Sequence, residues 1–359
     1  MASAPKISIS DAFDGGNIKF IEQRVNPHDP SIIDLILHIK PDVYTELEKI
    51  AHMQYFSFRI SLGGLEKGTS QTVKYIIANA SETSYPEAWQ GSTVCWSLDV
   101  EDANSWKRKT DTFYTQGQLT WEHTHTSNGS TYFSYFPPYS YGRHLSLISK
   151  CAQYARNVEP LGQSIQGREI ECIVHGTGDK ICWITCRQHP GETMAEHYAE
   201  GLLTRLLGLD TVGVVDEFVQ GMLEKYTFYI VPCMCPDGAV MGHLRTNAVG
   251  ANLNREWTTK GDYEAPTLER SPEVYWVLKK MDETGVDAAL DIHGDEELPY
   301  NFISGANLIP NWSDRLEWLH GAFTAHYSRT NNDMQQKIGY VSQTVCKSLI
   351  STCDENERD

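Results

Sequence analysis

Three residues of the kinds that bind metal ions stand at two places in this sequence. His189 and Glu192 are three positions apart in a His-Pro-Gly-Glu turn, and His293 comes much later, two residues after Asp291. Two imidazoles and one carboxylate form the ligand set that holds a catalytic zinc ion and leaves a position open for water. Each residue alone is common by chance, so the prediction of one zinc ion per chain depends on their occurring together.

Apolar runs precede both groups and predict the elements that must position them. Buried strands are predicted over 181–186, 226–231 and 286–292. A helical period covers 192–207, and further helices are predicted over 214–225 and 272–283. In open α/β sheets ligands bind at the carboxyl ends of the strands, so we expect the three residues to meet there. Asp291 shares a strand face with His293 and is expected to order the polar surroundings of the metal.

The chain divides into two parts of different composition. Short runs rich in β-branched and aromatic residues, separated by Gly and Pro turns, predict an antiparallel β-sandwich over residues 1–140. Its strands are expected at 7–10, 18–21, 32–39, 55–62, 72–77, 93–100, 117–121 and 132–135. Beyond Pro137-Pro138, strands alternate with helical periods, which predicts an α/β domain over residues 141–359.

Length and composition exclude several classes of protein. The 359 residues carry a net charge of −17, which argues against a nucleic-acid partner because phosphate binding requires a basic surface. No apolar run reaches the length of about 18 residues that a membrane helix requires, and no secretory signal is evident, so a cytoplasmic location is expected. The nine cysteines are expected to be reduced, buried thiols. The sequence leaves the oligomeric state open.

A Gly- and Asn-rich segment, residues 236–257, follows the middle predicted strand and carries Arg245, Asn254 and Arg255. Arginine presents a planar fork of donors that matches a carboxylate, and asparagine adds neutral donors. In isolation the segment would indicate a solvated loop with two exposed arginines. Beside a zinc ion it predicts a site for an anionic group.

Four motifs in this order resemble a known family. They are SYFPPYSY at 134–141, HPGE at 189–192, PDG with GHLRTN and GANLNREW across 236–257, and DIHGDEELPYNF at 291–302. From about residue 5 to about residue 340, the chain resembles zinc metallocarboxypeptidases of the carboxypeptidase A superfamily. Within that superfamily it is most similar to the cytosolic carboxypeptidase branch in its short, bacterial-type form.

The resemblance implies an N-terminal β-sandwich, a mixed central sheet and the three zinc ligands named above. It also implies hydrolysis of C-terminal residues, above all glutamate, from peptides or proteins through a zinc-activated water. It assigns Arg245 to the oxyanion, and Asn254 and Arg255 to the terminal carboxylate of the substrate. Tyr340 corresponds to a tyrosine that covers the substrate.

The chain departs from the family pattern after Tyr340. The general-base glutamate, which the family carries on a Thr-Leu-Glu-like strand, has no counterpart there; only Glu355 and Glu357 follow, in a polar tail. We therefore expect the α/β domain to be altered or incomplete after about residue 340, and less stable. Two alternatives stay open: a catalytically impaired relative that still binds zinc and peptide, and a zinc acylase of the aspartoacylase type.

Overall fold

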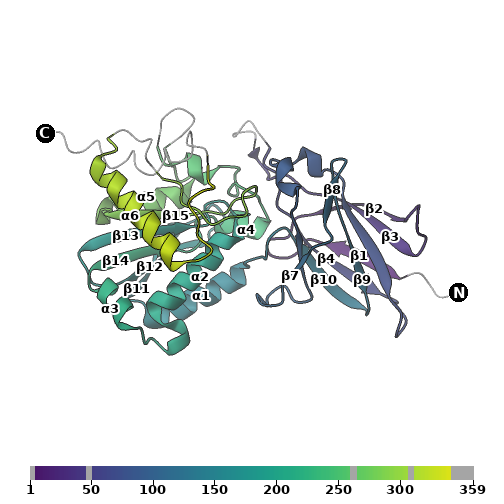
Figure 1. The fold of residues 1–359 in the computed structure, drawn as a ribbon, viewed down its shortest axis with the longest axis horizontal. Helices are drawn as coiled ribbons and strands as arrows, with labels where there is room; N and C mark the ends of the chain where they lie inside the picture. The colour runs from purple at the N-terminus through teal and green to yellow at the C-terminus, as the bar shows by residue number, and fades with distance from the viewer. Residues whose placement is uncertain (1–4, 46–50, 259–264, 306–310, 341–359) are drawn as a thin grey trace.

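The computed structural model describes residues 5–45, 51–258, 265–305 and 311–340. These residues form two domains, one built from strands and the other from a sheet flanked by helices (Figure 1). The segment 135–140 connects the last strand of the first domain to the first helix of the second. Within the described ranges, no helix combines the length and the apolar character that crossing a membrane would require.

Two five-stranded sheets make up the described part of the N-terminal domain, with strand orders β1-β4-β10-β6-β7 and β2-β3-β5-β9-β8. The first contains β1 (Lys6–Ser10), β4 (Ser57–Gly63), β10 (Gly129–Ser134), β6 (Val94–Ser97) and β7 (Lys107–Lys109). The second contains β2 (Lys19–Val25), β3 (Ile32–His38), β5 (Gln71–Ile77), β9 (Gln118–His125) and β8 (Phe113–Thr115). Side chains from both sheets form one hydrophobic core between them. The predicted sandwich is confirmed.

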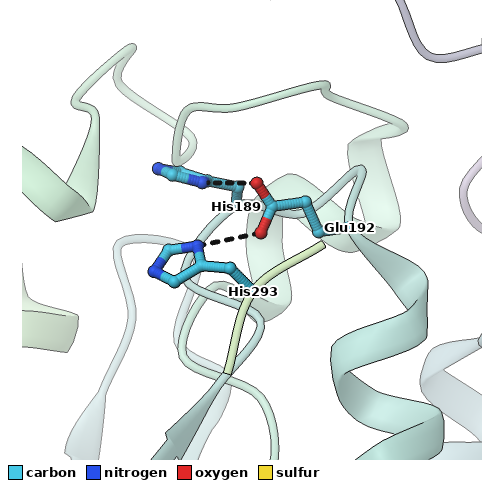
Figure 2. A group of neighbouring side chains, drawn as sticks. All are labelled: His189, Glu192 and His293. Carbon is cyan, nitrogen blue, oxygen red and sulfur yellow. Dashed lines mark hydrogen bonds and ion pairs between the residues drawn. The ribbon is translucent and has the colours of Figure 1, made fainter. Parts of the chain in front are cut away.

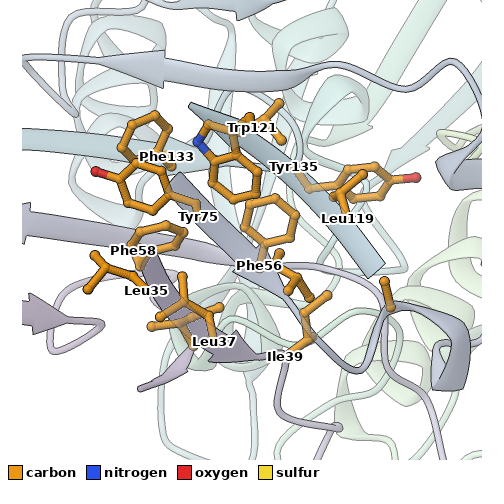
Figure 3. Packing of buried hydrophobic residues seen from close by; sticks show 14 of the residues in the cluster. Leu35, Leu37, Ile39, Phe56, Phe58, Tyr75, Leu119, Trp121, Phe133 and Tyr135 are labelled. Atoms are coloured by element: carbon orange, nitrogen blue, oxygen red, sulfur yellow. The ribbon is translucent and has the colours of Figure 1, made fainter. Parts of the chain in front are cut away.

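Aromatic side chains fill the centre of the sandwich (Figure 3). Tyr75 of β5 stacks on Trp121 of β9 with ring centroids 5.1 Å apart, and its ring lies 4.6 Å from that of Phe133 of β10. Because β5 and β10 belong to different sheets, these rings join the two layers. Large buried rings contribute much apolar area, so this domain has a substantial core of its own.

One strand pair of the sandwich differs from the predicted antiparallel arrangement. β3 and β5 run parallel, whereas the other described pairs of the sandwich are antiparallel. Between them the chain passes through β4 of the opposite sheet and returns in the same direction. The alternation of apolar residues specifies which face of a strand is buried but not its direction, so the sequence pattern missed this pair.

The second domain contains the mixed sheet that the resemblance implied. Its strand order is β11-β12-β14-β13-β15, and the last three run parallel to one another. The strands are β11 (Asn157–Gln163), β12 (Glu169–His175), β14 (Tyr226–Val231), β13 (Lys180–Cys186) and β15 (Ala288–Ile292). The helices are α1 (Tyr141–Tyr154), α2 (Thr193–Leu207), α3 (Glu217–Leu223), α4 (Pro236–Met241), α5 (Pro272–Thr284) and α6 (Asp314–Thr330).

Helices cover both faces of this sheet, and each face has its own core. Alternate residues of β13 point in opposite directions: Ile184 packs in a cluster with α1, α2 and α3, whereas Trp183 packs in a cluster with α5. Gly208, at φ +62°, ends α2 where the sequence predicted the helix to end. The seven described cysteines are free and buried.

The outer edge of the mixed sheet is less covered. Among the described residues β15 is the last strand of the sheet, and its Ala288 and Ala289 are exposed. α6 contains no buried residue. Residues 341–359, with the sequence departure and both tail glutamates, lie outside the described residues. The lower stability that the sequence predicts stays a prediction.

Candidate metal centre and substrate site

The carboxyl ends of two neighbouring parallel strands bring the predicted metal ligands together. β13 and β15 pair as far as Cys186 and Ile292; His293 follows Ile292 directly, and His189 is the third residue after Cys186. Glu192 is the residue that precedes the first turn of α2. One ligand atom from each of the three side chains can be chosen so that all lie within 4.8 Å of one another. The side chains come from three elements and converge on one point (Figure 2).

The carboxylate of Glu192 lies between the two imidazoles. Its Oε1 is 2.7 Å from Nδ1 of His189, and its Oε2 is 2.9 Å from Nδ1 of His293 (Figure 2). The backbone N–H of Gly294 donates to the same Oε2 at 2.9 Å. The nitrogen that faces the shared point is therefore Nδ1 in both histidines.

The outward nitrogen of each histidine faces a hydrogen-bond acceptor. Nε2 of His189 lies 3.2 Å from Oδ1 of Asn252, and Nε2 of His293 lies 2.6 Å from Oδ2 of Asp291. An imidazole that donates its Nε2 proton outward presents the lone pair of Nδ1 inward, which is the form that binds a metal ion. The donor set and its outer partners therefore fit a zinc ion.

Burial and neighbouring charges set the protonation of the site. Burial, followed by the Arg245 charge, lowers the pKa of His189 to about 4. Burial alone would raise the pKa of Glu192, but the two histidines outweigh it and lower that pKa. Burial alone would lower the pKa of His293, but Asp291 and Glu192 raise it well above its ordinary value.

Hydrogen bonds from neighbouring polar side chains hold Asp291 in place. Thr185 Oγ1 donates to its Oδ1 at 2.9 Å, and Gln188 Nε2 donates to its Oδ2 at 2.6 Å. Trp257 Nε1 in turn donates to Gln188 Oε1 at 2.9 Å. Asp291 therefore approaches His293 from a fixed position, as the shared strand face predicted.

A buried arginine supports the turn that carries His189 and Glu192. Arg187, at φ +56°, donates from Nε to the carbonyl oxygen of Pro190 at 3.0 Å. Its Nη1 donates to the carbonyl oxygen of Tyr139 at 2.9 Å and to Glu196 Oε2 at 2.5 Å. Tyr139 belongs to the aromatic segment between the domains, so that segment contributes directly to the shape of the metal-binding turn.

The loop that carries Arg245 lies against the same turn. Gly191 N–H donates to the carbonyl oxygen of Leu244 at 2.9 Å, and a Cβ at position 191 would lie 2.8 Å from that oxygen. Glycine is therefore required in the His-Pro-Gly-Glu motif. Arg245 is half-buried and close enough to lower the pKa of His189. Its guanidinium has no hydrogen-bond or ion-pair partner among the residues that the structure describes.

Asn254 and Arg255 are connected to the metal centre through Asn252. Asn252 Oδ1, which faces His189, also accepts a hydrogen bond from the backbone N–H of Asn254 at 3.2 Å. Arg255 Nη1 donates to the carbonyl oxygen of Asn254 at 2.9 Å. Asn254 is buried and Arg255 is half-buried.

Tyr340 lies beside the acidic residues that follow His293. Its hydroxyl donates to Asp295 Oδ2 at 2.5 Å, and its ring meets that of Phe302 edge-on at 5.0 Å. Burial and the bond to Asp295 raise the pKa of Tyr340, and the charge of Glu192 adds to the effect. The structure therefore brings all the predicted site residues into one region.

Comparison with known protein families identifies the family to which this fold belongs. Residues 145–354 match the family model of zinc carboxypeptidases, and residues 9–136 match that of the cytosolic carboxypeptidase N-terminal domain. The chain belongs to the zinc carboxypeptidase family. Its expected resemblance to cytosolic carboxypeptidases and to bacterial metallocarboxypeptidases is thereby confirmed.

Three relatives illustrate the extent of the similarity. An uncharacterized protein of Zymomonas mobilis is 38% identical over 335 residues, which make up 93% of this zinc carboxypeptidase and 80% of that protein. A metallo-carboxypeptidase from Pseudomonas aeruginosa, solved in complex with (2-guanidinoethylmercapto)succinic acid, is 35% identical with a TM-score of 0.79, covering 95% of this chain and 83% of that one. Human cytosolic carboxypeptidase 6 is 27% identical over 186 residues, 48% of this chain and 35% of that protein.

Sequence reasoning missed several residues that hold the site of this zinc carboxypeptidase in place. They are Asp42, Arg187, Gln188 and Asn252. Arg187 and Gln188 directly precede the His-Pro-Gly-Glu motif, and Asn252 lies within the Gly- and Asn-rich segment, so their position beside a motif was a usable signal. Asp42 gave no such signal in the sequence, because it lies in the other domain and beside none of the motifs.

Proposed function

We propose that this zinc carboxypeptidase hydrolyses the C-terminal residue of peptides or proteins with zinc held by His189, Glu192 and His293, and prefers glutamate. The observation that supports it most is the convergence of these ligands beside Arg245, whose guanidinium pairs with no described residue. Zinc bound there would act as a Lewis acid and lower the pKa of a water molecule toward about 7. A cytoplasmic location is part of the proposal.

Arg245 is the residue that we assign to the transition state. A cation that lies beside the ligands and pairs with none of the described residues is suited to the negative charge that develops on the scissile carbonyl oxygen. Its half-buried position reduces screening by water and strengthens the interaction. Because this charge is absent from the free substrate, Arg245 would raise the rate more than the affinity.

Asn254 and Arg255 are assigned to the terminal carboxylate of the substrate, which makes the enzyme an exopeptidase. Their backbone is tied to Asn252 and so to His189, which connects the carboxylate site to the metal ligands. Tyr340 is assigned to cover the bound substrate. Its hydroxyl donates to Asp295 in this structure, so it would exchange that partner for the substrate.

The residues that follow the last metal ligand are acidic. Asp295, Glu296 and Glu297 follow the last ligand, and burial, then Glu192, raise the pKa of Glu296 to about 8 while Arg245 opposes them. The preference for glutamate comes from the similarity to the cytosolic carboxypeptidase branch, whose expected partners are glutamate-rich C-termini.

The test uses the full chain loaded with zinc and three peptides that differ only in a C-terminal Glu, Gln or Lys. We expect release of the terminal residue in that order, with no release by the His189→Ala variant. His28→Ala, which removes an exposed histidine of the sandwich, is the control and should be as active as the wild type. Fastest release of lysine would contradict the glutamate preference alone.

The remaining outcomes distinguish the alternatives. Stoichiometric zinc and peptide binding without any release would identify an impaired relative and reject the proposed activity. Hydrolysis of N-acetylaspartate without peptide cleavage would identify an acylase. Turnover by the wild-type chain would show that it contains a proton acceptor for the attacking water, against the expectation that the general base is missing.

A further inference from the structure

We propose that Asp42, a residue of the sandwich domain, is the positioning residue for Arg245. Its carboxylate holds the backbone of residues 244–246, so that the N-terminal domain aims the arginine of the α/β domain at the metal ligands. The inference rests on the role proposed above for Arg245. It gives the sandwich domain a direct part in the reaction.

The Asp42 carboxylate receives four hydrogen bonds from three consecutive residues. Leu244 N–H donates to its Oδ1 at 2.6 Å, and Arg245 N–H donates to its Oδ2 at 2.8 Å. Thr246 donates to the same Oδ2 from its N–H at 2.9 Å and from its hydroxyl at 3.0 Å. Consecutive N–H groups around one carboxylate form an anion-binding concavity, and bonds to a charged acceptor are the strong ones.

The residues on both sides of Arg245 are buried between the domains. Leu244 is 2% exposed, and its side chain belongs to the hydrophobic core of the sandwich, while Thr246 is fully buried. The carbonyl oxygen of Leu244 accepts the hydrogen bond from Gly191 of the metal-binding turn. Arg245 therefore sits between an anchor to the sandwich and an anchor to the metal turn, and it alone of the three residues is half-buried.

Two further contacts from the sandwich domain limit how the loop could relax. Asn17 Nδ2 donates to the carbonyl oxygen of Gly242 at 3.0 Å. On the other side, a Cβ at Gly250 would lie 1.9 Å from the carbonyl oxygen of Tyr44, so these two backbones are in direct contact. The sandwich thus holds the loop before, at and after Arg245.

Loss of the Asp42 charge should weaken the hydrogen bonds that hold the backbone of residues 244–246. An Asn at this position keeps one acceptor oxygen and presents an amide donor in place of the other, so at least one buried N–H of residues 244–246 loses its partner. A backbone group left unpaired in this way favours rotation of the loop. Misplacement of a catalytic group by about 1 Å can reduce a rate by about 10²-fold.

The experiment is a double-mutant cycle on the zinc-loaded full chain. Asp42→Asn should reduce kcat by about ten- to hundredfold with little change in KM and with zinc content unchanged. In the Arg245→Ala background the same substitution should change kcat by less than about twofold, because Asp42 acts through Arg245. A reduction equally large in both backgrounds would overturn the proposal.

Asp34→Asn is the matched control. Asp34 is 2% exposed, lies on β3 of the same domain and accepts a hydrogen bond from Asn26 Nδ2 at 2.7 Å. It shares burial and charge with Asp42, but its hydrogen-bond partners Arg24 and Asn26 belong to the sandwich and not to the loop. This variant should keep the wild-type kcat. A loss of kcat equal to that of Asp42→Asn would show that destabilisation of the sandwich suffices and would overturn the proposal.

Hydrogen exchange provides a readout that does not depend on turnover. Amides of residues 244–246 should exchange at least about tenfold faster in Asp42→Asn than in the wild type, whereas those of β13, which is paired with a strand on each side, stay protected. Unchanged exchange would overturn the positioning role even if the wild type proved inactive, so failure of this inference and failure of the proposed function are distinguishable.

A milder variant covers the case in which Asp42→Asn does not fold. Thr246→Val removes only the hydroxyl donor and keeps the size of the side chain and the backbone amide. It should reduce kcat by about two- to fivefold, the loss of one of four bonds. A kcat equal to that of the wild type would overturn the proposal.

Discussion

The metal centre and the arginine loop lie in contact, yet different parts of the molecule hold them. The ligands His189, Glu192 and His293 stand at the ends of β13 and β15 and at the start of α2, all within the α/β domain. Their outer partners, Asn252 and Asp291, belong to the same domain. A metal centre of this kind depends on local strand pairing.

The arginine loop depends on both domains instead. Asp42 and the sandwich core hold residues 244–246, and Gly191 connects the loop back to the metal turn. The comparison indicates that zinc binding should tolerate changes in the sandwich, whereas the alignment of Arg245 should not. Experiments that measure zinc content separately from turnover therefore test this division.

The largest effect is expected from loss of the metal. Glu192→Ala removes the carboxylate between the two imidazoles, so zinc should be lost and peptide hydrolysis should fall by about 10³-fold or more. Elemental analysis and a hydrolysis assay measure both quantities. Glu217→Ala, an exposed glutamate of α3, is the control. Full zinc occupancy in Glu192→Ala would show that the ligand assignment is wrong.

Arg245→Ala should have the next largest effect and should separate rate from metal binding. We expect kcat to fall by about 10²- to 10³-fold while zinc content stays at the wild-type level. Arg255→Ala should instead raise KM, because it acts on the bound carboxylate in the ground state as well. Steady-state kinetics on one peptide compares the two variants. Equal effects on KM and kcat in both would contradict the separate roles.

Asp291→Asn should weaken zinc binding without abolishing it. The substitution removes the charge that orients His293, and loss of such an outer partner reduces metal affinity by about 10- to 100-fold. Titration with zinc in competition with a chelator measures the change, and activity should return at saturating zinc. Asp282→Asn, on the exposed side of α5, is the control. Unchanged affinity would argue against the orienting role of Asp291.

Substitution of His144 should have the smallest effect on activity. It should nevertheless change how the free energy of unfolding depends on pH. Burial alone would lower its pKa, but Glu171 and Glu196 outweigh it and raise the pKa from 6.5 to about 9. The folded state therefore favours the protonated form, and the stabilisation is complete below about pH 6.5 and is lost as the pH rises to about 9.

The measurement is the free energy of unfolding at pH 6.5 and at pH 9 for the wild type and His144→Gln. The wild type should lose more stability over this interval than the variant, since Gln cannot titrate. His28→Ala should lose as much as the wild type. An identical pH dependence of the wild type and His144→Gln would refute the raised pKa. Since Glu196 also holds Arg187 below the metal turn, zinc content should be recorded in parallel.

Much of the fold followed from the sequence because strand and helix periods report burial directly. The ends of β13 and β15 and the span of α2 were predicted closely, and they place the three metal ligands. The strands β7 and β8, three residues each, were too short to show a period. The parallel pairing of β3 with β5 was missed because residue alternation carries no information on strand direction.

What the sequence determined by itself was the chemistry of the site: which residues can bind zinc, which can bind a carboxylate, and the family whose motifs they form. Their types and their spacing along single elements are local properties, and a local pattern reports them. Which groups hold those residues in place became evident only from the folded arrangement of both domains. Asp42 lies 202 to 204 residues before the backbone amides that it binds. No periodicity connects positions so far apart, because their contact exists only once both domains have folded and packed together.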